Sequence, residues 1–243
     1  MKKRWIIIIL ALFIIAVFLI FMVLSKKIQI NKMFVNKSDI LGVDISHYQG
    51  EVDMEKLANQ NIKFVYIKAT EGSKSIDENF FVNWQNGQTS GMYIGDYHFF
   101  SFDSDGKEQA EHFINTVGVL SGTLIPVVDV EYYGDKEKNP PDKETIVSGL
   151  KEYLRLLEKE YQVKPMLYTT EKVYAKYIKE SFDEYPIWIR SVYYPAKYVA
   201  GENWLFWQYS DREILEGYIG EEKYIDMNVF HGEEEELGQY LCP

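Results

Sequence analysis

The feature that most limits the fold of this chain is an alternation of short apolar runs with longer amphipathic stretches. Three stretches, over 77–88, 108–117 and 142–157, show the helical spacing of apolar residues, and Asp142 stands where a helix cap is expected. Strands that alternate with helices imply parallel β-α-β units. Eight short runs are therefore predicted to be strands, at residues 41–46, 64–69, 93–99, 124–130, 166–169, 187–192, 205–209 and 224–229.

Eight strands in about 200 residues predict an α/β fold, an irregular TIM-like (β/α) barrel. The later connections, notably 211–222, are too short for full helices, so we expect the last strands to lack them. Barrels of this kind carry their functional residues at the carboxyl ends of the strands. The residues at those ends are therefore the first candidates for a site.

An uncharged apolar run without proline occupies residues 5–24. About 20 apolar residues in a helix span a hydrocarbon core of about 30 Å. A cleaved secretory signal usually has an apolar core of about 7–15 residues and ends at a small-residue site. The length of this run and the lack of such a site favour a retained transmembrane anchor.

This interpretation divides the chain into four parts. We expect a short cytoplasmic N-terminus at 1–4, a single membrane span at 5–24, a basic juxtamembrane linker at 25–38 and a catalytic barrel at 39–243. Lys and Arg flank both sides of the span, so the positive-inside rule favours neither orientation. A short N-terminus normally stays cytoplasmic, which places the barrel outside the cell membrane.

Charge argues against one class of partner. All 37 Asp and Glu residues lie at or beyond Asp39, with 19 of the 26 Lys and Arg, so this part carries a formal charge of −18. Nucleic-acid phosphates need Lys and Arg to neutralise them, so we expect no nucleic-acid binding. Cys242 is the single cysteine, which excludes an internal disulfide and a thiolate-rich metal site.

Acidic residues occur in or directly after three of the predicted strands. Asp44 lies in the first strand, Asp129 and Glu131 close the fourth, and Asp226 lies in the last. Side chains at i and i+2 of a strand point the same way, so Asp129 and Glu131 should both face the barrel axis, with Val130 facing the helices. Acids are disfavoured in strands, and finding them on three strands indicates a function.

Two neighbouring carboxyl groups are suited to one kind of chemistry. Like charge and burial raise the pKa of one member of such a pair. A neutral acid beside an anion is what glycosidic cleavage requires, because the acid protonates the leaving oxygen and the anion stabilises the positive charge at the anomeric carbon. A lone Asp-x-Glu triplet is usually solvated. Much of the evidence for a functional role therefore comes from the acids on the other two strands.

These residues lie in blocks that resemble glycoside hydrolase family 25, the Chalaropsis-type lysozymes. The resemblance covers residues 41–230, nearly the whole predicted domain. The blocks occur in the family's order: GVDISHYQG (42–50), FVYIKATEG (64–72), YHFF (97–100), PVVDVE (126–131), FWQYS (206–210) and IDMNVF (225–230).

The resemblance implies an N-acetylmuramidase with a shortened barrel, which cleaves the β-1,4 bond between N-acetylmuramic acid and N-acetylglucosamine in peptidoglycan. It implies Glu131 as general acid and Asp129 as the partner that holds the substrate's acetamido group as internal nucleophile, with retention of configuration. Asp44 and Asp226 match two further acids of the groove. No metal or organic cofactor is implied.

Candidate substrate-binding residues come from the same strand ends. Tyr97, Trp188 and Trp207 offer flat aromatic faces suited to stacking on sugars, although bulky rings also pack in cores. Many family members have Trp-x-Ala where this chain has Trp188-Ile189-Arg190. Arg190 therefore brings a cation to the groove, to pair with an acid or to contact the lactyl or peptide carboxylate of muramic acid. Lys68 is expected at the rim, or in a structural ion pair.

Two alternatives remain open from the sequence. A catalytically inactive tether that binds cell-wall sugars would need no acid of raised pKa, yet all four acids are present. A chitinase-like barrel glycosidase would carry the longer pattern Asp-x-x-Asp-x-Asp-x-Glu, whereas Pro126, Val127 and Val128 precede Asp129 here. Turbidity assays on purified walls and mass spectrometry of the new reducing ends separate the three.

Overall fold

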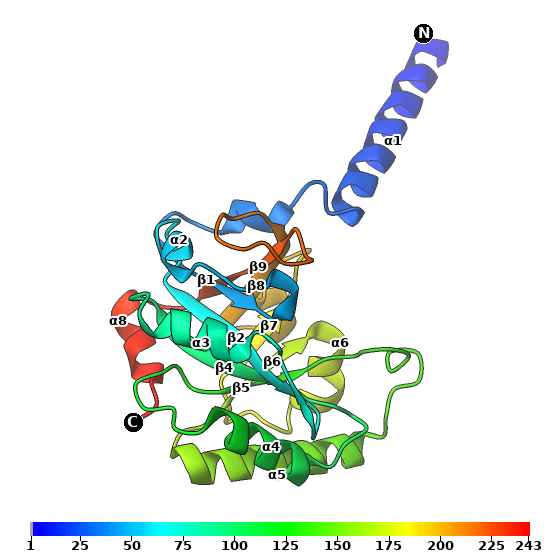
Figure 1. The fold of residues 1–243 in the computed structure, drawn as a ribbon. Coiled ribbons are helices and arrows are strands. Elements are labelled where there is room, and N and C mark those ends of the chain that lie inside the picture. The colour runs from blue at the N-terminus through cyan, green and yellow to red at the C-terminus, as the bar shows by residue number, and fades with distance from the viewer. Residues whose placement is uncertain (1) are drawn as a thin grey trace.

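The predicted strands close into a barrel in the computed structural model, which describes residues 2–243 (Figure 1). Met1, part of the predicted N-terminus 1–4, lies outside the described residues. A two-residue strand, β3 (Ser75–Ile76), pairs with β2 outside the barrel. The barrel strands are β1 (Ile40–Ile45), β2 (Phe64–Glu71), β4 (Tyr93–Phe99), β5 (Val127–Val130), β6 (Met166–Thr170), β7 (Ile187–Arg190), β8 (Phe206–Glu213) and β9 (Ile225–Phe230).

The strand order is β1-β9-β8-β7-β6-β5-β4-β2, and a parallel pairing of β1 with β2 closes the ring. The closed α/β barrel predicted from the sequence is thus confirmed. The expectation of parallel strands is wrong for β9, which runs antiparallel to both β8 and β1. Antiparallel strands need no crossover helix, and the chain between β8 and β9 has none. This reversal brings the first residues of β9 to the rim where the other strands end.

The long helices of the barrel lie in the early connections, and the later connections contain only helical segments of three to five residues, as the prediction that the last strands lack full helices requires. Asp142 caps the longest helix of the barrel by accepting a hydrogen bond from the backbone N–H of Thr145 at 2.9 Å. Gly118, with φ of +73°, ends the preceding helix. The helices of the first half are α2 (Met54–Ala58), α3 (Phe80–Gln88), α4 (Gly106–Val117) and α5 (Lys143–Tyr161); those of the second half are α6 (Glu171–Val173), with a π-helical turn at Tyr174–Ile178, α7 (Lys197–Ala200) and α8 (Glu234–Leu237).

Aromatic rings fill the barrel below the rim. Phe64 packs edge-on against Phe206, with ring centroids 4.9 Å apart, and Trp188 lies 5.1 Å from both Tyr66 and Tyr168. Glycine makes room for two of these rings. A Cβ atom at Gly42 would lie 2.3 Å from the Phe64 ring, and one at Gly95 would lie 2.3 Å from the Tyr66 ring. We call these five aromatic residues the aromatic plug.

We expect Gly95→Ala to lower the free energy of unfolding by about 2–3 kcal/mol, because the new methyl group must displace the Tyr66 ring. Gly238→Ala is the matched control. Gly238 has helical φ of −61° and its nearest neighbour atom, Tyr93 Oη, is 3.9 Å away, so alanine should be neutral or slightly stabilising there. Urea unfolding measures both. Equal stability of the two variants would contradict this packing.

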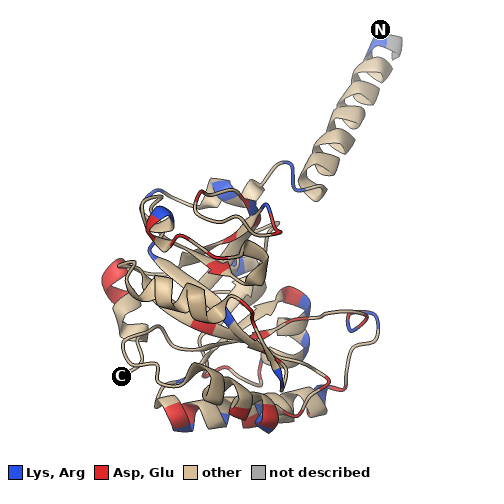
Figure 2. Cartoon of the chain, viewed as in Figure 1, with Lys and Arg blue, Asp and Glu red and all other residues tan. Residues whose placement is uncertain are grey.

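A 23-residue helix, α1 (Lys2–Leu24), projects from the barrel. Its side chains from Arg4 to Leu19 are exposed, and Figure 2 shows no charged residue along it beyond its N-terminal end. The segment Arg4–Leu24 is long and apolar enough to cross a membrane, a property that it shares with secretory signals. The chain then forms a short 3-10 helix, η1 (Ile30–Phe34), beside β8.

Candidate active site

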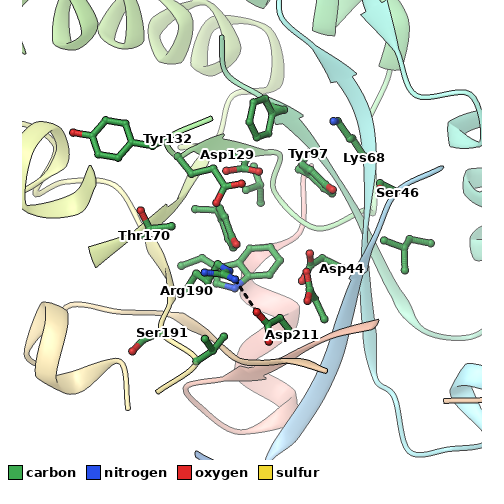
Figure 3. A pocket seen from close by; sticks show the side chains of 18 of the residues that line it. Asp44, Ser46, Lys68, Tyr97, Asp129, Tyr132, Thr170, Arg190, Ser191 and Asp211 are labelled. Atoms are coloured by element: carbon green, nitrogen blue, oxygen red, sulfur yellow. Dashed lines mark hydrogen bonds and ion pairs between the residues drawn. The ribbon is translucent and has the colours of Figure 1, made fainter. Parts of the chain in front are cut away.

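A groove of about 830 Å³ opens at the barrel rim where the parallel strands end and β9 begins. A volume of this size is typical of a ligand site. Figure 3 shows Asp44, Asp129, Tyr97 and Arg190 facing the same space. All four predicted acids line this groove, together with Tyr97, Trp188, Arg190 and Lys68.

Asp129 and Glu131 enter the groove from the end of β5. Val130 between them is buried and does not line the groove, so the alternation predicted from the sequence is present. Asp129 is only 8 % exposed. Burial and the neighbouring charge of Glu131 raise the pKa of Asp129 well above its ordinary value, and burial likewise raises the pKa of Glu131 against the opposing charges of Arg190 and Lys68.

Asp44 and Asp226 face each other across the antiparallel pair of β1 and β9. Directly opposed residues in such a pair have Cβ atoms about 4.5–5.5 Å apart, and like charges there repel. Burial raises the pKa of Asp44 to about 6, although a 2.7 Å hydrogen bond from the side-chain amide of Asn228 opposes the rise. Burial, and then the charge of Asp44, raise the pKa of Asp226 well above its ordinary value.

Two cations lie among these acids. The Arg190 guanidinium donates to Asp211 Oδ2 at 2.9 Å and lowers the pKa values of Asp44, Asp129, Glu131 and Asp226 from across the groove. Lys68 lines the groove, the position expected for a rim residue, and also donates to Glu71 at 2.6 Å, the contact expected for a structural ion pair. Arg190 therefore supplies positive charge to all four acids at once.

The predicted aromatic residues occupy different positions. Tyr97 lines the groove and is partly exposed. Trp188 forms part of its floor, but is 1 % exposed and donates from its indole N–H to Asn228 Oδ1 at 3.0 Å. Trp207 does not line the groove. It lies on the outer face of β8, 3 % exposed, and donates to the Ser191 carbonyl, so the expected contact with sugar is corrected to a packing role.

Several residues of the site were not predicted. Asn228 is buried next to the groove and joins Asp44 to Trp188, and its place two residues after Asp226 on one strand could have indicated it. Tyr132 and Asp211 are among the unpredicted residues that line the groove. Irregular pairing after Gln208 interrupts the alternation of β8, so no sequence spacing points to Asp211.

The cluster can perform acid–base chemistry, because burial raises the pKa values of its carboxyl groups above those of exposed ones. A protonated carboxyl donates to a leaving oxygen, and an adjacent carboxylate stabilises developing positive charge. Within residues 2–243, no three His, Cys, Asp or Glu side chains are grouped as ligands of a metal ion.

We expect Asn228→Ala to raise the pKa of Asp44 above about 6, because the variant removes the donor that stabilises its anion. Carbon-13 NMR of labelled Asp side chains measures the titration, with Asp44→Asn to assign the signal. Asn86→Ala is the control, since Asn86 does not line the groove and its side-chain amide donates to the Val52 carbonyl. An unchanged or lower pKa for Asp44 in Asn228→Ala would contradict this assignment.

Comparison with known proteins agrees with this geometry. The family model for glycosyl hydrolases family 25 matches residues 43–218. The chain belongs to this family. It is 28 % identical to Lysozyme M1 of Streptomyces globisporus, across 80 % of this chain and 69 % of that protein. It is 33 % identical to the uncharacterized protein YegX of Escherichia coli K12, across 83 % of this chain and 73 % of YegX.

The fold is likewise similar to solved structures of the family. A family 25 glycosyl hydrolase from Bacillus anthracis superposes with a TM-score of 0.80 and 47 % identity, covering 86 % of this chain and 96 % of that one. The chain is thus a glycoside hydrolase, and the non-catalytic tether considered from the sequence is set aside.

Proposed function

We propose that this protein is a membrane-anchored lysozyme that cleaves the β-1,4 bond between N-acetylmuramic acid and N-acetylglucosamine in peptidoglycan. The observation that carries the proposal is the convergence of Asp44, Asp129, Glu131 and Asp226 on one groove, where burial raises the pKa of each. Membership of a family that includes lysozymes supports this substrate over chitin.

In this mechanism Glu131 is the general acid. Burial raises the pKa of its carboxyl, and in the protonated form its O–H donates to the glycosidic oxygen as the bond to the anomeric carbon breaks. Arg190 lies close enough to lower this pKa, so the proton is held less tightly than burial alone would hold it. Glu131 then becomes the carboxylate that the second step needs.

Asp129 orients the substrate's own nucleophile. Its Oδ1 is buried and has no hydrogen-bond partner among residues 2–243, and an unpaired buried acceptor is costly. The acetamido N–H of muramic acid would satisfy it and would favour the anionic form of Asp129, which leaves the shared proton on Glu131. The acetamido carbonyl oxygen attacks the anomeric carbon, and the product is an oxazolinium ion.

Water completes the reaction. The Glu131 carboxylate takes a proton from water, whose oxygen attacks the anomeric carbon and reopens the oxazolinium ring. Two successive inversions retain the configuration of the sugar. The ionised member of the Asp44–Asp226 pair adds negative potential near the cationic intermediate, and Tyr97 offers the ring for stacking on the pyranose. Arg190 is placed to contact the lactyl or peptide carboxylate of muramic acid.

We expect Glu131→Gln to reduce the clearing of purified cell walls by about a thousandfold or more, because the amide cannot donate an acidic proton. Glu111→Gln, on the exposed face of α4, is the matched control and should clear walls like the wild type. Equal clearing by Glu131→Gln and the wild type would exclude Glu131 as the acid. Mass spectrometry should find muramic acid at the new reducing ends; glucosamine there would favour a different bond.

The anchor is tested separately from the chemistry. We expect the expressed protein to stay in the membrane pellet after an alkaline carbonate wash, at the mass of the full chain, with its barrel accessible to protease outside the cell. Ile14→Lys places a charge at the centre of the span, at a cost of about 2.5–3.5 kcal/mol, and should weaken insertion. A shorter chain in the soluble fraction would show that residues 5–24 are a cleaved signal.

A further inference from the structure

The segment between α1 and the barrel, expected to be a linker, is packed onto the groove rim. We call residues 26–34 the clasp. We propose that the clasp is a positioning element of the active site, which holds Arg190 and the β7–β8 rim in place and joins them to the end of α1. The inference rests on the proposed function, because it concerns how wall fragments bind the same groove.

The clasp begins in an ordered turn. Lys26 has left-handed φ of +55°, the N–H of Lys27 donates to the Met22 carbonyl at 2.9 Å, and that of Lys26 donates to the Val23 carbonyl at 2.8 Å. This is the Schellman arrangement that ends many helices. A Schellman turn satisfies the last carbonyl groups of α1 and fixes the direction in which the chain leaves it.

Asn31 joins the end of β7 to β8 through hydrogen bonds. It is completely buried, and its side-chain amide donates to the Ser191 carbonyl at 2.7 Å and to the Tyr209 carbonyl at 3.1 Å. Ser191 follows β7 and lines the groove, whereas Tyr209 belongs to β8. One clasp residue thus bonds the backbone on both sides of the rim, which a flexible linker would not do.

Lys26 connects the clasp to Arg190, because both side chains contact Asp211. Its ammonium pairs with Asp211 Oδ2, the oxygen that also accepts from Arg190 at 2.9 Å, and lies 5.8 Å from the centre of the Tyr193 ring. Asp211 and Tyr193 both line the groove. Asp211 is therefore held from two sides, and fixing it restricts the positions that Arg190 can take.

Further contacts hold the clasp along β8. Gln29 accepts from Ser210 Oγ at 2.6 Å and donates to the Arg212 carbonyl at 3.3 Å, and Lys32 pairs with Glu213. These β8 residues flank Asp211 in the stretch where the strand departs from regular pairing. The clasp thus supplies the partners that β8 lacks there.

The test measures kcat and KM of the full-length chain in detergent, on soluble wall fragments. Lys26→Gln should raise KM about two- to fivefold and leave kcat within about twofold, because the lost contact orients a binding group without touching the reacting bond. Lys26→Arg should restore KM. Lys27→Gln is the matched control, since Lys27 is exposed and forms no ion pair with residues 2–243.

A double-mutant cycle tests the route through Asp211. In an Asp211→Asn background, Lys26→Gln should add no further rise in KM, since the two residues act through one contact. Asn31→Ala should raise KM about tenfold and also lower the unfolding temperature, because two buried carbonyl groups lose a donor. The same KM for Lys26→Gln and Lys27→Gln, or a full Lys26→Gln effect without Asp211, would overturn the proposal.

Failure of the proposed function is separable from failure of the clasp. A wild-type protein that clears no walls would contradict the lysozyme mechanism. In that case calorimetry measures the affinity of wall fragments for Glu131→Gln and for the double variant Glu131→Gln/Lys26→Gln. This comparison tests the clasp without turnover. A weaker affinity in the double variant would support the clasp, and an equal affinity would overturn it.

Discussion

The structure depends on four carboxyl groups of like charge being buried together above the aromatic plug. Water would ionise all four, and their repulsion in a low-dielectric rim would then oppose folding. The plug keeps water out from below, because Tyr66, Tyr168 and Trp188 fill the space beneath the acids. Burial therefore raises the pKa values of all four carboxyl groups and shifts each toward its neutral form.

Several features make the burial tolerable. Arg190 places one positive charge within reach of all four acids, and Asn228 donates to Asp44. The reversal of β9 sets Asp226 opposite Asp44, a pairing that a parallel final strand would not produce at this rim. The cost of the cluster is thus offset by a few specific contacts. Each of these contacts also affects how the groove holds substrate or protons.

Much of this arrangement could be predicted because it follows from short-range periodicity. The alternation of Asp129, Val130 and Glu131 placed two acids on one face, and the caps and spacing located α4 and α5. The features that the sequence did not predict depend on pairing between distant segments. Nothing local in 225–230 encodes strand direction, and the irregular pairing of β8 hid Asp211. Trp207 was predicted from its place at a strand end, although it lies one residue from both Phe206 and Gln208 and so points to the opposite face of β8 from theirs.

The clasp is the clearest case of structure beyond sequence pattern. Residues 25–38 have the polar, basic composition of a spacer, and only the fold shows Asn31 buried against Ser191 and Tyr209. A helix that ends in an ordered turn and continues into the groove rim joins α1 to the site physically. The clasp therefore packs as part of the barrel, although its composition is that of a spacer.

The proposed mechanism requires the Asp129–Glu131 pair to retain a proton at neutral pH. Infrared difference spectroscopy measures this, because a protonated carboxyl group has a carbonyl stretch that a carboxylate lacks. In protein labelled with carbon-13 at Asp and Glu side chains, we expect such a band at pH 7, and we expect its loss when Glu131→Gln and Asp129→Asn are combined. A spectrum at pH 7 with no protonated carboxyl, or with a band that the double variant leaves unchanged, would contradict it.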